Sequence, residues 1–226
     1  MSLKLRAIRW LGITLAILAA LLFVPAGSVR FWQGWAFLLL MAAFWIFFFV
    51  DLLKHDPKLV ERRLQRREAQ PEQKLFQKLF SFVFFFSFVV AGLDFRFGWS
   101  RAWLGPVPVA FVVAGQALTA AGYWFVFWVL KTNSFAASTI QVETEQKVIS
   151  ISPYRFVRHP MYLGMVLTTV ATPLALGSYV ALPVYALLIP VLIFRLIHEE
   201  KILRRDLPGY AEYCQLTRFR LVPWVW

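Results

Sequence analysis

Charge, cysteine and metal-binding motifs are all scarce in this sequence, and each scarcity excludes a class of protein. Only 16% of the 226 residues are charged, whereas 60% are hydrophobic, which excludes an ordinary soluble domain and indicates an integral membrane protein. The single cysteine, Cys214, excludes an intrachain disulfide and a cysteine-based metal cage. The three histidines show no metal-ligand spacing, so we expect no metal.

Long apolar runs are abundant, and they predict about six membrane-spanning helices. The first four spans are expected at about 10–25, 31–53 and 75–93 and within 102–130, because each run is long enough to cross a hydrocarbon core of about 30 Å. The first run follows three basic residues and also resembles a signal peptide. We favour an uncleaved span, because the run is long for a signal and further spans follow.

The last two spans are expected to form a tight hairpin. Residues 160–194 carry no charge, and a single helix of that length would be far longer than the bilayer core is thick. Pro173, Gly177, Ser178 and Pro183 predict a turn in the middle of the run. The fold class is therefore an all-α polytopic membrane helix bundle, with a pocket at the mouth of this hairpin.

Basic residues are distributed unevenly along this layout. The formal net charge is +12, which in a membrane protein reflects topology and contact with anionic lipid rather than nucleic-acid binding. With six spans, 21 of the 24 lysines and arginines lie on one side, so both termini and the hairpin mouth are expected to face the cytoplasm. The basic segment 56–74 is either an interfacial amphipathic helix or a solvated loop, and the sequence leaves both open.

Ionisable residues gather at the two ends of the hairpin, and they give the first sign of function. One end reads Arg158-His159-Pro160-Met161-Tyr162, and the other contains Arg195, Glu199 and Glu200. Such groups at the mouth of an apolar hairpin cost free energy unless they pair or bind a ligand. We expect Tyr210 and Tyr213, which follow, to belong to an interfacial aromatic belt.

These residues resemble a known family. The pattern Arg158-His159-Pro160-Met161-Tyr162-Leu163-Gly164, an apolar hairpin, Glu199-Glu200 and Tyr210-x-x-Tyr213 is similar to the isoprenylcysteine carboxyl methyltransferase family and the related phospholipid N-methyltransferases. The resemblance covers about 133–226 and implies an S-adenosylmethionine-dependent methyltransferase. It divides the chain into N-terminal spans (1–130, with an interfacial basic loop) and a methyltransferase core (131–226).

The resemblance also implies site residues. For the cofactor they are Gln146, Lys147, Val148, Ile149, Tyr154, His159, Pro160, Met161, Tyr162 and Glu199. Gln146 stands where the family has histidine, and a further family glutamine corresponds to Gln141 if a gap is allowed. Arg195 falls on the residue that meets the substrate, so Arg195 and Glu199 are the expected catalytic pair. The implied acceptor is a lipophilic or prenylated molecule from the membrane.

The residue types suit this chemistry. A carboxylate such as Glu199 can accept hydrogen bonds from ribose hydroxyls, and aromatic faces such as Tyr154 or Tyr162 attract a sulfonium. Arg158 and His159 are candidates for the cofactor's own carboxylate. Arg195 and Glu199 are spaced i, i+4 and share a helix face. Methyl transfer to an ionised carboxylate needs positioning and exclusion of water, but no metal.

Two other functions remain open at this point. The C-terminal segment also resembles the end of membrane sterol reductases, although the chain is shorter than those proteins and has no GxGxxG motif. A transporter would need polar groups near the bilayer midplane, and the predicted spans contain few of them.

Overall fold

The computed structural model describes residues 2–64, 71–135 and 146–226, and within these ranges its regular structure is all helical. The helices are α1 (Leu3–Ala26), α2 (Trp32–His55), α3 (Pro57–Leu64), α4 (Pro71–Phe97), α5 (Trp99–Leu104), α6 (Val109–Thr132), α7 (Pro160–Ala175), α8 (Ala181–Ala186), α9 (Leu188–Asp206) and α10 (Tyr210–Leu216). The prediction of an all-α membrane bundle is confirmed.

Five helical segments in the described ranges are long and apolar enough to cross a membrane. They are α1, α2, residues 74–97 of α4, α6, and the combined run of α8 and α9. The fifth predicted span corresponds to α7, which is apolar but has only 16 residues. That α7 also crosses the membrane stays a prediction.

Two of the four residues expected at the hairpin turn lie within helices instead. Pro173 is inside α7 and Pro183 is inside α8, and the chain reverses over residues 176–180, where Gly177 has φ 70°. Pro183 is tolerated because it lies in the first turn of α8, where a backbone N–H has no intrahelical partner. Glycine suits the left-handed conformation at 177 because it has no Cβ.

Helices α6 and α7 pack with their backbones in close contact. A Cβ atom added to Gly115 would lie 2.4 Å from the backbone nitrogen of Ala175, and one added to Gly122 would lie 2.6 Å from the Thr168 methyl carbon. Small residues of this kind let membrane helices approach closely, so that dispersion contacts between the helices are maximised. These contacts lie at the middle and the end of α7 and hold the helix against α6.

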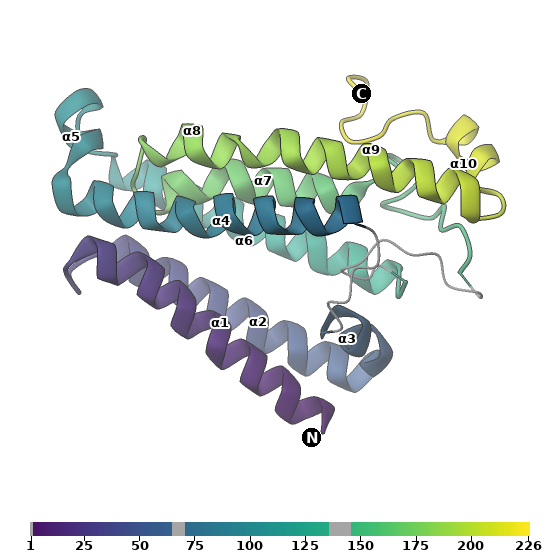
Figure 1. The fold of residues 1–226 in the computed structure, drawn as a ribbon, viewed down its shortest axis with the longest axis horizontal. Helices are drawn as coiled ribbons and strands as arrows, with labels where there is room; N and C mark the ends of the chain where they lie inside the picture. The colour runs from purple at the N-terminus through teal and green to yellow at the C-terminus, as the bar shows by residue number, and fades with distance from the viewer. Residues whose placement is uncertain (1, 65–70, 136–145) are drawn as a thin grey trace.

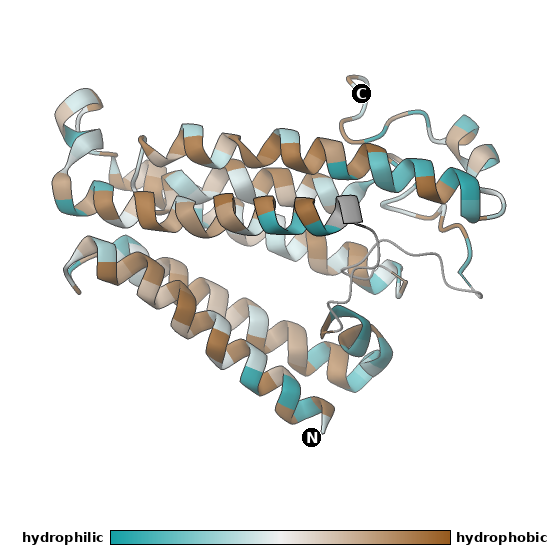
Figure 2. Cartoon of the chain, in the orientation of Figure 1, coloured by the Kyte–Doolittle hydropathy of each residue, from teal (hydrophilic) through white to brown (hydrophobic). Residues whose placement is uncertain are grey.

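The helices form two groups (Figure 1). The hairpin of α7, α8 and α9 packs with α4 and α6, while α1 and α2 lie beside this bundle and α3 joins α2 to α4. Figure 2 shows hydrophilic residues gathered toward one end of the molecule, on α3, on the end of α9 and on α10. The rest of the bundle surface is mainly apolar, as a lipid-facing surface must be.

Of the two forms predicted for the basic segment 56–74, residues 57–64 adopt the helix and not the solvated loop, while its place at the membrane interface stays a prediction. Residues 57–64 form α3, and the side chains of Leu59 and Val60 are fully buried against Phe48 and Leu52 of α2 and their neighbours. The apolar face of α3 is therefore covered by protein rather than by lipid or water. Residues 65–70 lie outside the described ranges.

Candidate active site

The signature residues before α7 are fixed by the C-terminal segment of the chain. The backbone N–H groups of Arg158 and His159 donate to the carbonyls of Phe219 and Arg220, each at 2.9 Å. Pro160 then begins α7 at a position that needs no backbone donor. These contacts hold the Arg158 and His159 side chains against the end of α9.

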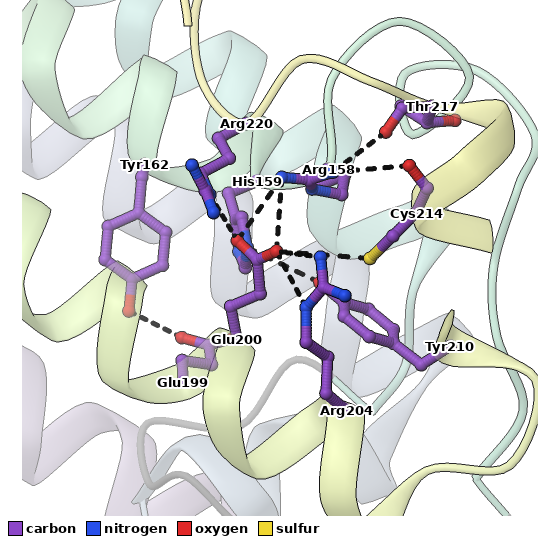
Figure 3. Close-up of polar contacts among 10 residues, drawn as sticks. All are labelled: Arg158, His159, Tyr162, Glu199, Glu200, Arg204, Tyr210, Cys214, Thr217 and Arg220. Carbon is purple, nitrogen blue, oxygen red and sulfur yellow. Dashed lines mark hydrogen bonds and ion pairs between the residues drawn. The ribbon is translucent and has the colours of Figure 1, made fainter. Parts of the chain in front are cut away.

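Glu200 is the centre of a buried charged cluster at that end (Figure 3). Its side chain is almost completely buried, and its carboxylate lies 3.1 Å from Arg158, 2.8 Å from Arg204 and 2.7 Å from Arg220. His159 Nε2 lies 3.8 Å from the same carboxylate. Arg158 and His159 are also buried, so this cluster pairs Arg158 with Glu200, two of the charges that the sequence places at the hairpin mouth.

Glu199, the neighbouring carboxylate, has a different environment. Its Oε2 accepts a hydrogen bond of 2.6 Å from the Tyr162 hydroxyl across the hairpin (Figure 3), and its side chain is only partly buried. Arg195, one turn earlier on α9, also interacts with Tyr162. The two adjacent glutamates therefore have different surroundings: Glu200 lies inside the charged cluster, and Glu199 lines a pocket.

That pocket, which we call the polar pocket, lies at the end of the bundle and encloses about 850 Å³ counted with its open mouth. It is lined by Asn133, Phe135, Gln146, Lys147, Val148, Ile149, Tyr154, Arg158, His159, Pro160, Met161, Tyr162, Arg195, Glu199, Leu203, Leu207, Tyr210 and Tyr213. Every site residue predicted from the sequence is among them. The structure thus brings these residues together, while their roles stay predictions. Gln141 lies outside the described residues.

The prediction that Tyr210 and Tyr213 form an aromatic belt is wrong. Both side chains are about 4% exposed and form part of the pocket wall. The Tyr213 hydroxyl donates to the Tyr154 carbonyl at 2.7 Å, and burial raises the pKa of both tyrosines. They turn inward because α10 folds back onto α9, which the sequence alone does not show.

Tyr154 forms another part of the wall. Its hydroxyl accepts a hydrogen bond of 3.0 Å from the Asn133 side-chain amide. Burial raises the pKa of Tyr154 to about 12, so this phenol is neutral at physiological pH. It can stack on a ligand or donate a hydrogen bond to it, but it cannot act as an anionic base.

A second hollow, the apolar cavity, lies deeper among the helices and adjoins the polar pocket. It is lined by Phe44, Trp45, Phe48, Arg63, Phe76, Gln77, Phe80, Ser81, Tyr123, Val126, Leu130, Met161, Tyr162, Met165, Thr168, Val191, Leu192 and Arg195. Met161, Tyr162 and Arg195 line both spaces. A polar compartment and an apolar compartment therefore meet at three side chains.

Four residues that were not assigned to the site from the sequence lie at or next to it in the structure. Glu200 and Arg220 form the buried cluster, Asn133 holds Tyr154, and Arg63 lines the apolar cavity. The paired glutamates were visible in the sequence, but nothing there distinguished the buried one. Arg63 belongs to a basic segment far from the signature, and no local pattern links the two.

Comparison with known proteins supports part of the sequence-based interpretation. Residues 110–207 match the model of the phospholipid methyltransferase family. A search of curated protein sequences found no significant match. Among solved structures, the chain is similar to a eukaryotic intramembrane Ras methyltransferase, an isoprenylcysteine carboxyl methyltransferase, with a TM-score of 0.49 and 17% identity, over 97% of this chain and 77% of that one.

Proposed function

We propose that the chain is a membrane methyltransferase that transfers a methyl group from S-adenosylmethionine to a lipophilic carboxylate, and the match of residues 110–207 to the phospholipid methyltransferase family supports this proposal. One observation carries the proposal. The polar pocket and the apolar cavity meet at Met161, Tyr162 and Arg195. A water-soluble donor and a lipid acceptor need such a junction, because the donor must reach the reacting atoms from water and the acceptor must reach them from the bilayer.

The donor groups of the polar pocket fit S-adenosylmethionine. Glu199 presents a partly buried carboxylate, which would accept hydrogen bonds from the ribose hydroxyls. Arg158 lines the pocket, and its Nε is buried with no hydrogen-bond partner among the described residues, so it would donate to the amino-acid carboxylate. The rings of Tyr154 and Tyr162 offer aromatic faces to a sulfonium.

S-adenosylmethionine supplies an activated methyl group, so an ionised acceptor needs no general base. The contribution of this chain is then positioning and exclusion of water. Arg195 lies at the junction and would hold the acceptor carboxylate, while the hydrogen bond from Tyr162 keeps Glu199 on the donor side. The apolar cavity would take the acceptor's hydrocarbon chain and keep water from the reacting atoms.

The proposed orientation puts both termini and the polar pocket in the cytoplasm. Its support is the excess of lysine and arginine on one side of the six-span layout. Hydrophilic residues also gather at the end of the molecule that carries the pocket (Figure 2). A cytoplasmic pocket has direct access to a charged, water-soluble donor.

The test uses native membranes that contain either the wild-type chain or the Glu199→Gln variant. With S-adenosylmethionine labelled in its methyl group, we expect label in the lipid phase from wild type and about tenfold less or lower from the variant, the loss expected for one charge-assisted hydrogen bond. Mild alkali should release the label as methanol, because it cleaves a methyl ester. Label that resists alkali would point to a lipid amine as acceptor, and no label in lipid would refute the function.

A further inference from the structure

Helix α3 contributes to the site although it lies outside the part of the chain that matches the family. The match covers residues 110–207, whereas α3 spans Pro57–Leu64. The buried side chains of Leu59 and Val60 fix α3 against α1 and α2. The Arg62 guanidinium donates to the Ser134 carbonyl at 2.9 Å. The helix is therefore held to the loop that begins the polar-pocket wall.

Arg63, the next residue of α3, lines the apolar cavity together with Arg195 of α9. Two guanidinium groups from distant parts of the sequence thus reach one mainly apolar space. Among the described residues that line this cavity, none is acidic. Both arginines make further contacts within the chain, so what matters here is the charge they present to the cavity.

Keeping the Arg63 guanidinium charged in this cavity costs electrostatic free energy. Burial, and secondly the positive charge of Arg195, lower the pKa of Arg63 to about 10. The group still carries its proton at neutral pH, and it does so against both desolvation and a like charge. A bound anion between the two guanidinium groups would offset both costs.

We propose that Arg63 and Arg195 together hold the anionic group of the acceptor, so that Arg63 determines specificity for a lipophilic carboxylate. This proposal rests on the proposed function and names a further residue that selects its substrate class. Arg195 reaches the carboxylate at the junction with the polar pocket, and Arg63 does so from the side of the apolar cavity. The acceptor's hydrocarbon chain extends among the aromatic and aliphatic side chains beyond them.

Two cations also favour release of the product. The acceptor binds as an anion, and methylation of one carboxylate oxygen forms a C–O bond while the carbon–sulfur bond of the donor breaks. The sulfonium charge and the carboxylate charge both disappear, so the neutral ester loses its attraction to Arg63 and Arg195 and leaves. An amine acceptor would gain positive charge beside the same two arginines, which disfavours it.

The experiment measures binding of matched lipophilic probes to the purified protein in detergent. The probes are N-acetyl-S-farnesylcysteine, its carboxamide and its methyl ester, and the measured quantity is the ratio of acid to amide affinity. We expect wild type to prefer the acid over both neutral probes, and Arg63→Gln to reduce the acid-to-amide ratio by about tenfold, the loss expected for one charge-assisted hydrogen bond. Affinity for S-adenosylmethionine should remain at the wild-type value.

Lys58→Gln is the matched control, because it removes the same charge from an exposed position on α3. An unchanged ratio in Arg63→Gln, or an equal loss in Lys58→Gln, overturns the proposal. If Arg63→Gln is not recovered folded, Arg63→Lys carries the test: it should lower the ratio because it loses the planar fork, and an unchanged ratio overturns the proposal. Methyl transfer from S-adenosylmethionine is measured in parallel. A protein that prefers the acid probe but transfers no methyl group would contradict the proposed methyltransferase function and leave the role of Arg63 in anion binding intact.

Discussion

Replacing Glu200 by glutamine should destabilise the protein, whereas the same change at Glu199 should weaken cofactor binding and leave stability almost unchanged. The reason is their surroundings. Glu200 is 3% exposed and neutralises Arg158, which is 7% exposed, at 3.1 Å. Without the carboxylate, Arg158 is a buried charge with no compensation, and His159 loses its neighbouring anion.

The magnitude follows from burial. Breaking a buried ion pair by removing one partner costs about 3–5 kcal/mol, and we expect the lower end, about 3 kcal/mol, because glutamine keeps one accepting oxygen. Arg204 and Arg220 also contact Glu200, but their side chains are 45% and 37% exposed, so each adds less than about 1 kcal/mol. A loss of about 3 kcal/mol corresponds to a fall in Tm of roughly 6–12 °C for a chain of this length.

The assay is thermal unfolding of the purified protein in detergent, followed by tryptophan fluorescence, for Glu200→Gln and Glu199→Gln in parallel. Arg204→Gln is the control, because it removes an exposed partner of the same carboxylate and should shift the Tm by only a few degrees. Equal stability of the two glutamate variants would refute the division of roles. So would a Glu200→Gln protein as stable as wild type.

Three further predictions concern packing, the substrate and the topology. Gly115→Ala should cost about 1–3 kcal/mol, because its Cβ would lie 2.4 Å from the Ala175 nitrogen, whereas Gly12→Ala meets nothing within 4 Å and should leave the Tm unchanged or higher. Arg195→Lys should lower acceptor turnover about tenfold with S-adenosylmethionine affinity intact, because lysine lacks the planar fork; a parallel loss of cofactor affinity would show that Arg195 only supports the cofactor site. Reporter fusions after Ser178 should report the outside and fusions at Trp226 the inside, and an external C-terminus would reject the proposed orientation.

The position of the candidate site was predictable because it depends on the length of one apolar run. An uncharged run of 35 residues is too long for one span, so its two charged ends must come together. Residues 158–162 and Glu199 therefore had to meet, and the hydrogen bond from Tyr162 to Glu199 joins them. The length of the run was sufficient here, since the meeting of its two ends does not depend on side-chain packing.

The assignment of Glu199 and Glu200 to different environments could not be predicted in the same way. Adjacent helical residues point about 100° apart, and which of them is buried depends on the elements that pack against α9. Those elements are the segment before α7 and the C-terminal segment with Arg220, which are paired through the backbone of Arg158 and His159. No periodicity in either segment records this pairing.

The basic segment 56–74 shows the same limit in another form. Its sequence pattern favours a helix with one apolar face, and residues 57–64 do form α3. The pattern does not say whether lipid or protein covers that face, because both are apolar. Burial of Leu59 and Val60 against α2 decides the matter, and it brings Arg63 to the apolar cavity as a consequence.

The most direct test of the two-compartment site is an experimental structure of the chain bound to S-adenosylhomocysteine and a lipophilic carboxylate. The account predicts the nucleoside in the polar pocket with its ribose on Glu199, the hydrocarbon chain in the apolar cavity, and the carboxylate and the sulfur meeting at Tyr162 and Arg195. A nucleoside bound elsewhere, or a lipid whose carboxylate lies away from this junction, would contradict it.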